Sequence, residues 1–356
     1  MNRRECLKGA LAVIALPATA RAAQSGFAPV VPGRVLRFPE DEGSHPGFRT
    51  EWWYVTGWLD GAGEPLGFQV TFFRARPHPA SGNPSRFDPR DILILHAAVS
   101  ERAHGRLRHV QRGARAGFGL AEAATGRTAV HIDDWYLRTN AAGYATRIDA
   151  GDFTLDLQLD PTQPPLLQGD GGYSRKGPRP ESASYYYSLP HLRVGGQVRI
   201  EGRTRDVLGS AWFDHEWSSE YMAPQAVGWD WTGINLDDGS ALMAFRMRTR
   251  DGRTFWAAAT LKRAQQRRTF APDEVVWSPK RTWRSPRTGA TYPVAMELRV
   301  GDLRVELVPM MDDQENDARI TTGAVYWEGA VTALVHGQPA GRGYMELTGY
   351  AGKLEL

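Results

Sequence analysis

The chain has 356 residues, of which 42% are apolar, 10% aromatic and 23% charged. This composition is ordinary for a soluble globular protein, and the length allows about two domains of the usual size. The formal net charge is only +3, and the 22 residues at the start hold four basic residues against one acidic residue. Without them 39 basic and 39 acidic residues remain, so no basic patch argues for nucleic-acid binding.

Residues 1–22 predict a cleaved export signal. Arg3 and Arg4 precede an uncharged run over residues 9–20, and the segment closes with an Ala-x-Ala pattern that ends at Ala22. These are the parts of a secretory signal, and the arginine pair indicates export by the twin-arginine translocon. The apolar run is shorter than the ~20 residues that a membrane span needs. We therefore expect cleavage near Ala22, a periplasmic protein and no stable membrane span.

The rest of the chain predicts an all-β fold. Stretches rich in β-branched and aromatic residues alternate with turn sequences, and no segment of a dozen residues shows a convincing helical period. Strands are expected at 51–59, 66–76, 91–102, 128–139 and 152–160. Residues 168–184, rich in glycine and proline, predict a long and mobile loop.

A weak internal repeat predicts two domains. The pattern W-x-x-T-G occurs at Trp53 and again at Trp229, each time before a turn and an apolar strand. The segments 209–214 and 341–346 share the order glycine, small residue, aromatic, carboxylate. We therefore expect two tandem antiparallel barrels or sandwiches, 27–222 and 223–356, each of which could keep an apolar interior for one ligand.

The segment GSAWFDHEWSS, residues 209–219, concentrates chemistry within a single predicted strand. Side chains alternate between the two faces of a strand. One face would therefore carry Trp212, Asp214 and Glu216, and the other Phe213, His215 and Trp217.

Other reaction classes find little support in the residues. A metal site would have to join Asp214 and Glu216 to His96 or His191, and no H-E-x-x-H pattern is present. The chain has no G-x-S-x-G elbow and no phosphate-binding glycine loop. Its one cysteine, Cys6, leaves with the export signal, so a thiolate mechanism is excluded.

Three further stretches combine aromatic rings with polar groups: Glu51 with Trp52, Trp53 and Tyr54; Tyr187 within a tyrosine triplet; and Asp230 between Trp229 and Trp231. Aromatic core packing explains any one ring, but it does not explain a carboxylate in nearly every cluster. A carboxyl group among indoles loses hydration and its pKa rises towards that of a general acid. Aromatic faces can stabilise a developing cation. The combination suits protonation of a C=C bond.

Several stretches together resemble the carotenoid 1,2-hydratase (hydroxyneurosporene synthase, AttH/CrtC-type) family, whose exported members are often labelled predicted secreted hydrolases. They are HPGFRTEWWYVTGWL, YYYSLPHL, GSAWFDHEW, GWDWTGINLDDGSALMAFRMR, YWEGAV and GYMELTGY, spread over residues 45–351 in the order of the family. The resemblance implies two lipocalin-like β-barrel domains and hydration of isoprenoid double bonds. Distant relatives of similar architecture include fungal cyclases that bind polyenes between the domains.

The resemblance places the family's H-x-W element on His215 and Trp217, beside Asp214 and Glu216. We expect Asp230 or Asp214 to protonate an alkene, and His215 to stabilise the cation and guide water.

The expected binding surface is mostly aromatic, without a cofactor or metal. It comprises Trp217, Trp229, Trp231, Trp52, Trp53 and Tyr54, with Glu51, Tyr187 and Glu346 as further polar groups. The expected ligand is a lipophilic isoprenoid- or polyene-like molecule.

Two alternatives use the same residues without catalysis. A lipophile carrier would need only the apolar cavity and a few polar groups. A cell-envelope assembly factor would instead bind protein through an exposed apolar patch.

Overall fold

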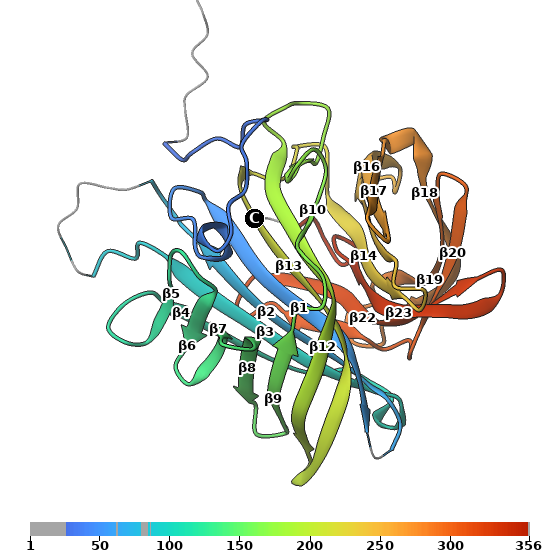
Figure 1. Ribbon diagram of the computed structural model, residues 1–356, viewed down its shortest axis with the longest axis horizontal. Helices are drawn as coiled ribbons and strands as arrows, with labels where there is room; N and C mark the ends of the chain where they lie inside the picture. The colour runs from blue at the N-terminus through green and yellow to red at the C-terminus, as the bar shows by residue number, and fades with distance from the viewer. Residues whose placement is uncertain (1–25, 62, 80–84, 86, 355–356) are drawn as a thin grey trace, which may run out of the picture.

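The computed structural model describes residues 26–61, 63–79, 85 and 87–354; the predicted export signal lies outside the described residues (Figure 1). The described chain forms two antiparallel β-sheets. Three single-turn 3-10 helices accompany them, η1 (Glu40–Glu42), η2 (Arg102–His104) and η3 (Pro272–Glu274). The predicted all-β class is confirmed. Within the described residues, no helix has the length and apolarity needed to cross a membrane.

The N-terminal sheet has the strand order β4-β3-β2-β1-β13-β12-β9-β8-β7-β6-β5, with β10 and β11 paired to β12. Its strands are β1 (Thr50–Gly61), β2 (Leu66–Ala75), β3 (Ile92–Glu101), β4 (Arg108–Arg115), β5 (Ala121–Ala123), β6 (Ala129–Ile132), β7 (Trp135–Asn140), β8 (Gly143–Asp149), β9 (Phe153–Asp160), β10 (Leu166–Leu167), β11 (Tyr173–Arg175), β12 (Ala183–Ile200) and β13 (Arg203–Glu220).

The C-terminal sheet has the order β17-β16-β15-β14-β23-β22-β20-β19-β18, with β21 paired to β22. Its strands are β14 (Gly228–Leu236), β15 (Ala241–Arg248), β16 (Thr254–Arg263), β17 (Gln266–Phe270), β18 (Val275–Arg284), β19 (Thr291–Val300), β20 (Leu303–Pro309), β21 (Glu315–Ala318), β22 (Ala324–Val335) and β23 (Gln338–Leu347). In both sheets the first strand pairs with the last, β1 with β13 and β14 with β23.

Two expected elements differ in the structure. The stretch 128–139 is a hairpin of β6 and β7, because Asp133 takes a left-handed conformation (φ 52°) and turns the chain between them. The segment 168–184, expected to be a mobile loop, contains β11 and packs against β12. Gln168, Lys176 and Ser182 in this segment are almost fully buried. Its glycines and prolines therefore shape a fixed connection.

The internal repeat is in structural register in the closing strands of the two sheets, β13 and β23. In the opening strands, β1 and β14, it is out of register. Tyr54 of β1 pairs with Asp214, and Trp231 of β14 pairs with Glu346. Asp214 and Glu346 thus occupy equivalent places, as the shared glycine-aromatic-carboxylate order predicts. Trp53, however, lies in the core of the N-terminal domain, whereas Trp229 packs against the junction between the domains. The two W-x-x-T-G patterns are therefore one residue out of structural register.

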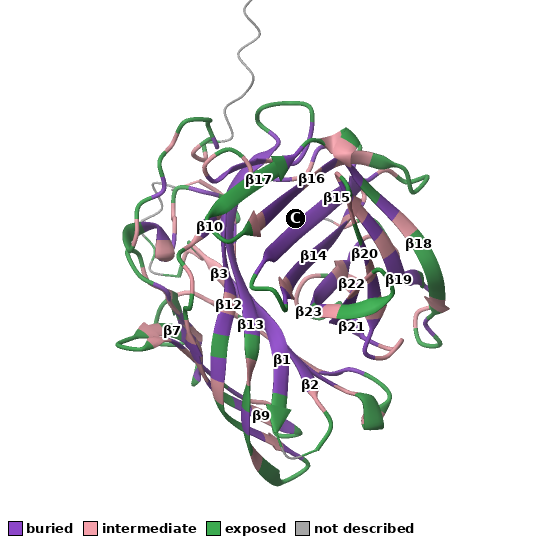
Figure 2. Cartoon of the chain, turned by 45° about the vertical axis from the view of Figure 1, so that its right-hand side comes forward, coloured by how far each residue is buried: buried purple, intermediate pink, exposed green. Residues whose placement is uncertain are grey.

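Strand β13 is covered on both faces in its second half. Residues 211–219 are all buried, whereas residues 203–206 are mostly exposed (Figure 2). Phe213 and Trp217 belong to the apolar core of the N-terminal domain, and Trp212 belongs to a separate cluster between the domains. The predicted alternation of faces is present, with one face in each environment.

The junction between the domains is aromatic and closely packed. Strand β1 contacts β23, β2 contacts β22, and β13 contacts β14. Trp58 donates from Nε1 to the carbonyl oxygen of Gly343 across the junction (3.0 Å). Gly67 of β2 permits the closest approach, because a Cβ atom there would lie 2.6 Å from Cβ of Ala330 and 2.7 Å from the Tyr344 hydroxyl.

We predict that Gly67→Ala destabilises the protein by about 1–3 kcal/mol, because the new methyl group overpacks the junction. The matched control is Gly113→Ala on β4, where the nearest atom to an added Cβ is 3.7 Å away. Urea unfolding of both variants measures the difference. Equal stabilities would contradict the close packing of the two domains.

Candidate functional site

A cavity of about 230 Å³ lies between the domains. Its wall is built by β1, β2, β3, β13, β14, β22 and β23, so both sheets contribute. The aromatic and acidic side chains that line it are Trp52, Tyr54, Phe73, Tyr221, Trp229, Trp231, Tyr326, Glu51, Asp214, Glu216, Glu328 and Glu346. The cavity thus joins residues from distant parts of the chain into one apolar space with five carboxyl groups.

Glu328 and Glu346 form a pair of carboxyl groups on neighbouring strands. They are direct partners in the ladder between β22 and β23; Glu328 is buried and Glu346 is half-buried. Burial raises the pKa of Glu346 to about 7. Burial, together with the charge of Glu346, raises the pKa of Glu328 well above its usual range. Two like charges this close disfavour each other's ionised form, so both carboxyl groups hold a proton more firmly than a free glutamate does.

Two polar atoms at this pair are incompletely satisfied. The Tyr54 hydroxyl and the Glu328 carboxyl group interact with each other, but neither the hydroxyl nor Oε1 of Glu328 makes a hydrogen bond of normal geometry among the described residues, although both atoms are buried. Glu346, in contrast, accepts a hydrogen bond from Trp229 Nε1 (2.8 Å). Because a buried polar atom without a partner costs free energy, Glu328 and Tyr54 are the groups in this wall that are best placed to contact a ligand.

Asp214 has a different role because its oxygens are fully engaged. It accepts hydrogen bonds from Ser188 (2.5 Å), Tyr186 (2.6 Å) and Trp212 Nε1 (2.7 Å). The Tyr186 hydroxyl in turn accepts from Nε1 of Trp231 (3.0 Å). Burial raises the pKa of Asp214 to about 7. Its three donors make it an anchor that orients Trp212, and through Tyr186 it also orients Trp231.

Glu216 forms an ion pair with Lys176, a residue that the sequence pattern did not predict to be part of the site. Lys176 lies 2.7 Å from Oε1 of Glu216 and is almost fully buried. Burial lowers the pKa of this lysine, although the charge of Glu216 opposes the shift. The ammonium group also lies over the rings of Phe245 (4.1 Å) and Tyr186 (4.9 Å). The segment after β11 therefore supplies one cation to the junction.

The structure places His215 and Trp217 on the face of β13 that points away from the cavity. They lie inside the N-terminal domain with Trp53 and Tyr187, and none of these four lines the cavity. The ring of His215 stacks on Trp53 (4.8 Å), and Nδ1 is 3.2 Å from the Tyr187 hydroxyl. This face of β13 packs into the core of the N-terminal domain, so the expectation that His215 and Trp217 meet a ligand finds no support in the position of this cavity and stays a prediction.

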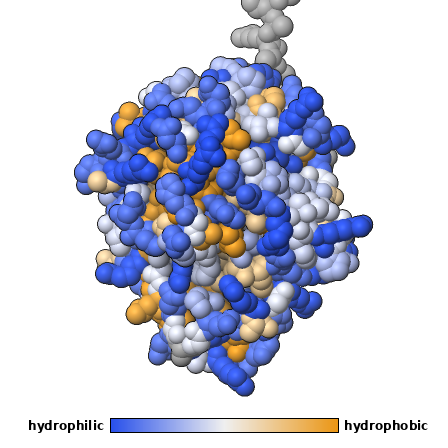
Figure 3. Space-filling model, turned by 90° about the vertical axis from the view of Figure 1, so that its right-hand side faces the viewer, coloured by the Kyte–Doolittle hydropathy of each residue, from blue (hydrophilic) through white to orange (hydrophobic). Residues whose placement is uncertain are grey.

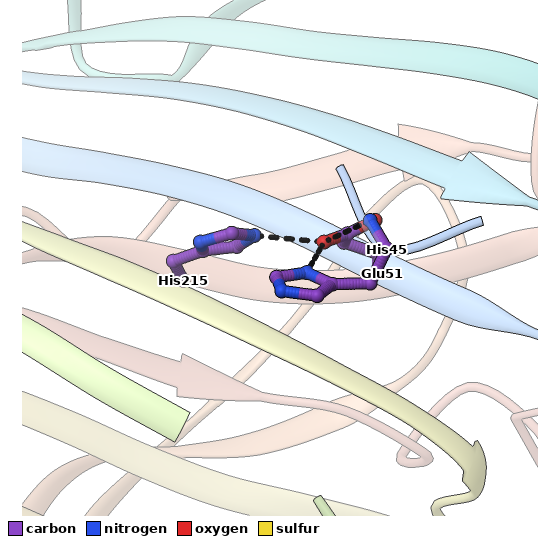
Figure 4. Close-up of side chains that lie close together, drawn as sticks. All are labelled: His45, Glu51 and His215. Atoms are coloured by element: carbon purple, nitrogen blue, oxygen red, sulfur yellow. Dashed lines mark hydrogen bonds and ion pairs between the residues drawn. The ribbon is translucent and has the colours of Figure 1, made fainter. Parts of the chain in front are cut away.

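Glu51 is the centre of a buried network on that inner face (Figure 4). Its Oε1 lies 2.6 Å from Nδ1 of His45 and 2.9 Å from Nε2 of His215, and Arg74 reaches its Oε2 at 2.8 Å. Burial alone would raise the pKa of Glu51, but the two histidines and the charge of Arg74 hold it well below its usual range. Although Glu51 borders the cavity, its carboxylate is committed to this network.

His45, Glu51 and His215 also form a group whose ligand atoms lie within 4.8 Å of one another, close enough for a metal ion. The donor set does not favour one. Both imidazoles already aim a nitrogen at the same carboxylate oxygen, and the other nitrogen of His45 lies 3.0 Å from Asp41. A guanidinium group on the remaining carboxylate oxygen would repel a cation. The arrangement is that of a compensated hydrogen-bond network.

Asp230 does not have the surroundings expected of a proton donor. Its side chain is fully buried and paired with Arg246 Nε (2.6 Å) and Arg248 Nε (2.8 Å), and the Tyr350 hydroxyl lies 3.1 Å away. Trp229 and Trp231, its neighbours, point to the other face and line the cavity. Asp230 therefore ties the first two strands of the C-terminal sheet together.

The sequence reasoning missed Glu328 and Lys176. Glu328 follows Tyr326 and Trp327, so it carries the same aromatic and acidic signal as the stretches that were singled out. Lys176 lies in a polar glycine-rich stretch and carried no such signal. His191 and His96, considered as metal ligands with Asp214 and Glu216, do not join them: Nε2 of His191 lies 2.9 Å from the Ser240 carbonyl oxygen, and His96 contacts Tyr326 (2.7 Å).

With this geometry established, comparison with known proteins identifies the family. A family model described as AttH-like matches residues 29–350. The chain belongs to the AttH-like family. A comparison with curated proteins gave no match.

Solved structures share the fold. An AttH protein from Nitrosomonas europaea is 55% identical, with 91% of this chain and 100% of that chain covered and a TM-score of 0.85. Kievitone hydratase from Nectria haematococca is 15% identical over 92% of this chain and 99% of that chain, with a TM-score of 0.68. CghA, solved with Sch210972, is 15% identical over 92% and 97%, with a TM-score of 0.53. At 15% identity these last two show similarity of fold.

We predict that Glu51→Gln destabilises the protein by about 3–5 kcal/mol, because it removes the charge that compensates buried Arg74 and His45 and leaves Arg74 with Asp91 as its one remaining carboxylate partner. Asp160→Asn is the control; it removes a surface pair with Arg193 (3.3 Å) and should cost about 1 kcal/mol or less. Denaturant unfolding measures both. A cost for Glu51→Gln as small as that of the control would show that the network is not structural.

We also predict a pH-dependent difference between the wild type and Glu346→Gln. A carboxyl group whose folded pKa is raised stabilises the fold fully below its unfolded pKa of about 4.5, and this stabilisation is lost as pH rises through about 7. The variant should therefore gain about 3 kcal/mol relative to the wild type between pH 4.5 and pH 8. Unfolding at several pH values measures this gain, with the partly exposed Glu297→Gln as control. A pH-independent difference would contradict the assignment.

Proposed function

We propose that this protein is a cofactor-free hydratase that adds water to a C=C bond of a lipophilic, isoprenoid- or polyene-like molecule held in the junction cavity. The observation that carries the proposal is the direct pairing of Glu328 and Glu346 in an aromatic wall, where the pKa of each carboxyl group is raised by loss of hydration; the proposal takes the pair to hold one proton. The fold shared with kievitone hydratase is consistent with it.

The pair can supply both proton transfers of a hydration. Glu328, the group that keeps its proton, donates it to one alkene carbon, and the positive charge develops on the other. Trp52 and Trp231, which line the cavity, offer aromatic faces to that charge. Glu346 accepts the proton that the attacking water loses as its oxygen bonds to the cation. The proton returns to Glu328 between turnovers, so atoms and charge balance without a cofactor.

The size of the cavity restricts the substrate. Ligand pockets commonly enclose about 300–1,000 Å³, and this cavity of about 230 Å³ lies below that range. It can enclose a small terpene-like molecule or one end of a longer chain. A long polyene would be bound by its terminus, and the reactive double bond would lie near that end.

A lipophile carrier remains the second candidate, and the largely apolar wall favours it. Binding alone does not require a proton donor beside a proton acceptor. The carboxyl pair therefore favours the hydratase over the carrier. Protein binding by an exposed patch is less suited to the structure. On the face shown in Figure 3 apolar side chains are interrupted by hydrophilic ones. Of the large exposed apolar residues, Phe87 stacks on Phe118 (5.5 Å), whereas Val35, Leu208 and Ile320 lie on separate parts of the chain.

We also propose that the protein works in the periplasm after export by the twin-arginine translocon. The paired arginines, the apolar run and the Ala-x-Ala pattern of residues 1–22 support this. Fractionation of the native host tests it: the mature chain, starting after Ala22, is expected in the periplasmic fraction, and a full-length cytoplasmic chain would contradict it.

Turnover can be tested with a panel of short isoprenoid alcohols in ¹⁸O-labelled water. We predict a hydrated product that carries one labelled oxygen. Glu328→Gln and Glu346→Gln should each lower its rate by about 10²–10⁴-fold, and Glu297→Gln should leave it unchanged. Retention of the same alcohols by these variants, measured by tryptophan fluorescence, separates loss of chemistry from loss of binding. Binding without any labelled product would select the carrier.

A further inference from the structure

The charges around the junction cavity are unbalanced. Of its five carboxyl groups, two have a cationic partner: Glu216 pairs with Lys176, and Glu51 pairs with Arg74. Arg74 also borders the cavity, but it is bound to Glu51 (2.8 Å) and Asp91 (3.0 Å). Among the described residues no ion pair reaches Asp214, Glu328 or Glu346. The cavity wall therefore carries an excess of negative charge whenever these groups are ionised.

The junction already binds one ammonium group in a way that shows what its wall can hold. Lys176 Nζ is held by the carboxylate of Glu216 and lies over three rings, those of Phe245, Tyr186 and Tyr221 (5.2 Å). A carboxylate and aromatic faces are the standard partners of an organic cation. The chain thus uses this chemistry for its own lysine.

The side of the cavity formed by β14, β22 and β23 repeats that chemistry, and no ion pair with a cation is present there among the described residues. Glu346 is the structural equivalent of Asp214, and Glu328 lies beside it. Trp229 and Trp231 line the same space, and Tyr221, which contacts Lys176, packs edge-on against Trp229 (5.5 Å). The Tyr54 hydroxyl and Oε1 of Glu328, which make no hydrogen bond of normal geometry among the described residues, belong to this side.

We propose that this side of the cavity binds an apolar organic cation, a tertiary or quaternary ammonium group on an apolar chain, in preference to an uncharged molecule of similar shape. The inference rests on the junction cavity being the ligand site of the proposed function. It deepens that function, because an ammonium group resembles the cation formed when an alkene is protonated.

Binding of the ammonium group in this side of the cavity displaces a proton from the carboxyl groups of Glu328 and Glu346. A positive group beside Glu328 and Glu346 favours their ionised forms, so the proton held by the pair is released to solvent as the ammonium group enters. The other titratable or charged groups that face the pair or its neighbours are Asp214 and Glu216 of β13, Lys176, Arg74 of β2, His96 of β3, and Tyr54, Tyr221, Tyr326 and Tyr344. Burial lowers the pKa of His96 to about 3, so this histidine adds no positive charge near neutral pH.

Calorimetry with octyltrimethylammonium and 1-octanol tests the proposal. We expect the ammonium ion to bind the full-length mature protein at least ~10-fold more tightly at pH 8 than at pH 6, because less proton release is needed at the higher pH. Titration at pH 6 in two buffers of different ionisation enthalpy should show net proton release. Octanol should bind without either effect, and octanoate should bind more weakly than octanol.

The double variant Glu328→Gln/Glu346→Gln should lose the preference for the cation and the proton release, and it should still bind octanol. Glu297→Gln should behave as the wild type. Octanol binding as tight as ammonium binding at pH 8, or ammonium binding without proton release, would overturn the proposal. Cation preference without ¹⁸O-labelled product would leave this inference standing and remove the hydratase, and the reverse result would do the opposite.

Discussion

Burial of one β-strand on both of its faces is the constraint on which the rest of the structure depends. The second half of β13 lies between the core of the N-terminal domain and the junction with the C-terminal domain. Every polar group on that stretch must find a partner or lose its charge. Asp214 and Glu216 point to one side of the strand and His215 points to the other. The buried polar groups are stabilised in different ways on the two sides.

Inside the N-terminal domain the solution is compensation. The carboxylate of Glu51 forms hydrogen bonds with His45, His215 and Arg74. These partners hold its pKa well below the usual range although the group is fully buried. Asp230, in the C-terminal sheet, likewise pairs with two arginines. Both carboxyl groups are held by cationic partners on neighbouring segments, which suits a structural tie.

In the junction the carboxyl groups are mostly uncompensated. Glu328 has no cationic partner and an oxygen without a hydrogen bond, and Glu346 has only the indole of Trp229. An uncompensated acid in an apolar wall costs stability, as the Glu346 pKa shift implies. Structures keep such a cost where it serves a ligand or a reaction, and this contrast separates the proposed site from the two structural networks.

The sequence predicted the all-β class, because alternation and turn residues report directly on strands, and it predicted which residues of β13 share a face. It could not predict which face meets the cavity. That depends on where the second sheet packs, and a strand covered on both sides has the same apolar pattern on each. His215 and Trp217 were chosen for their chemistry and belong to the core. Glu328 and Lys176 were missed because their importance comes only from contacts between segments far apart in the chain.

The shared proton of Glu328 and Glu346 is the central claim, and carbon-13 NMR titration of the glutamate carboxyl carbons tests it most directly. The account predicts one glutamate that stays protonated through neutral pH, assigned by its loss in Glu328→Gln, and a second that titrates near pH 7, assigned by its loss in Glu346→Gln. Both glutamates titrating near pH 4.5, as free glutamates do, would contradict it.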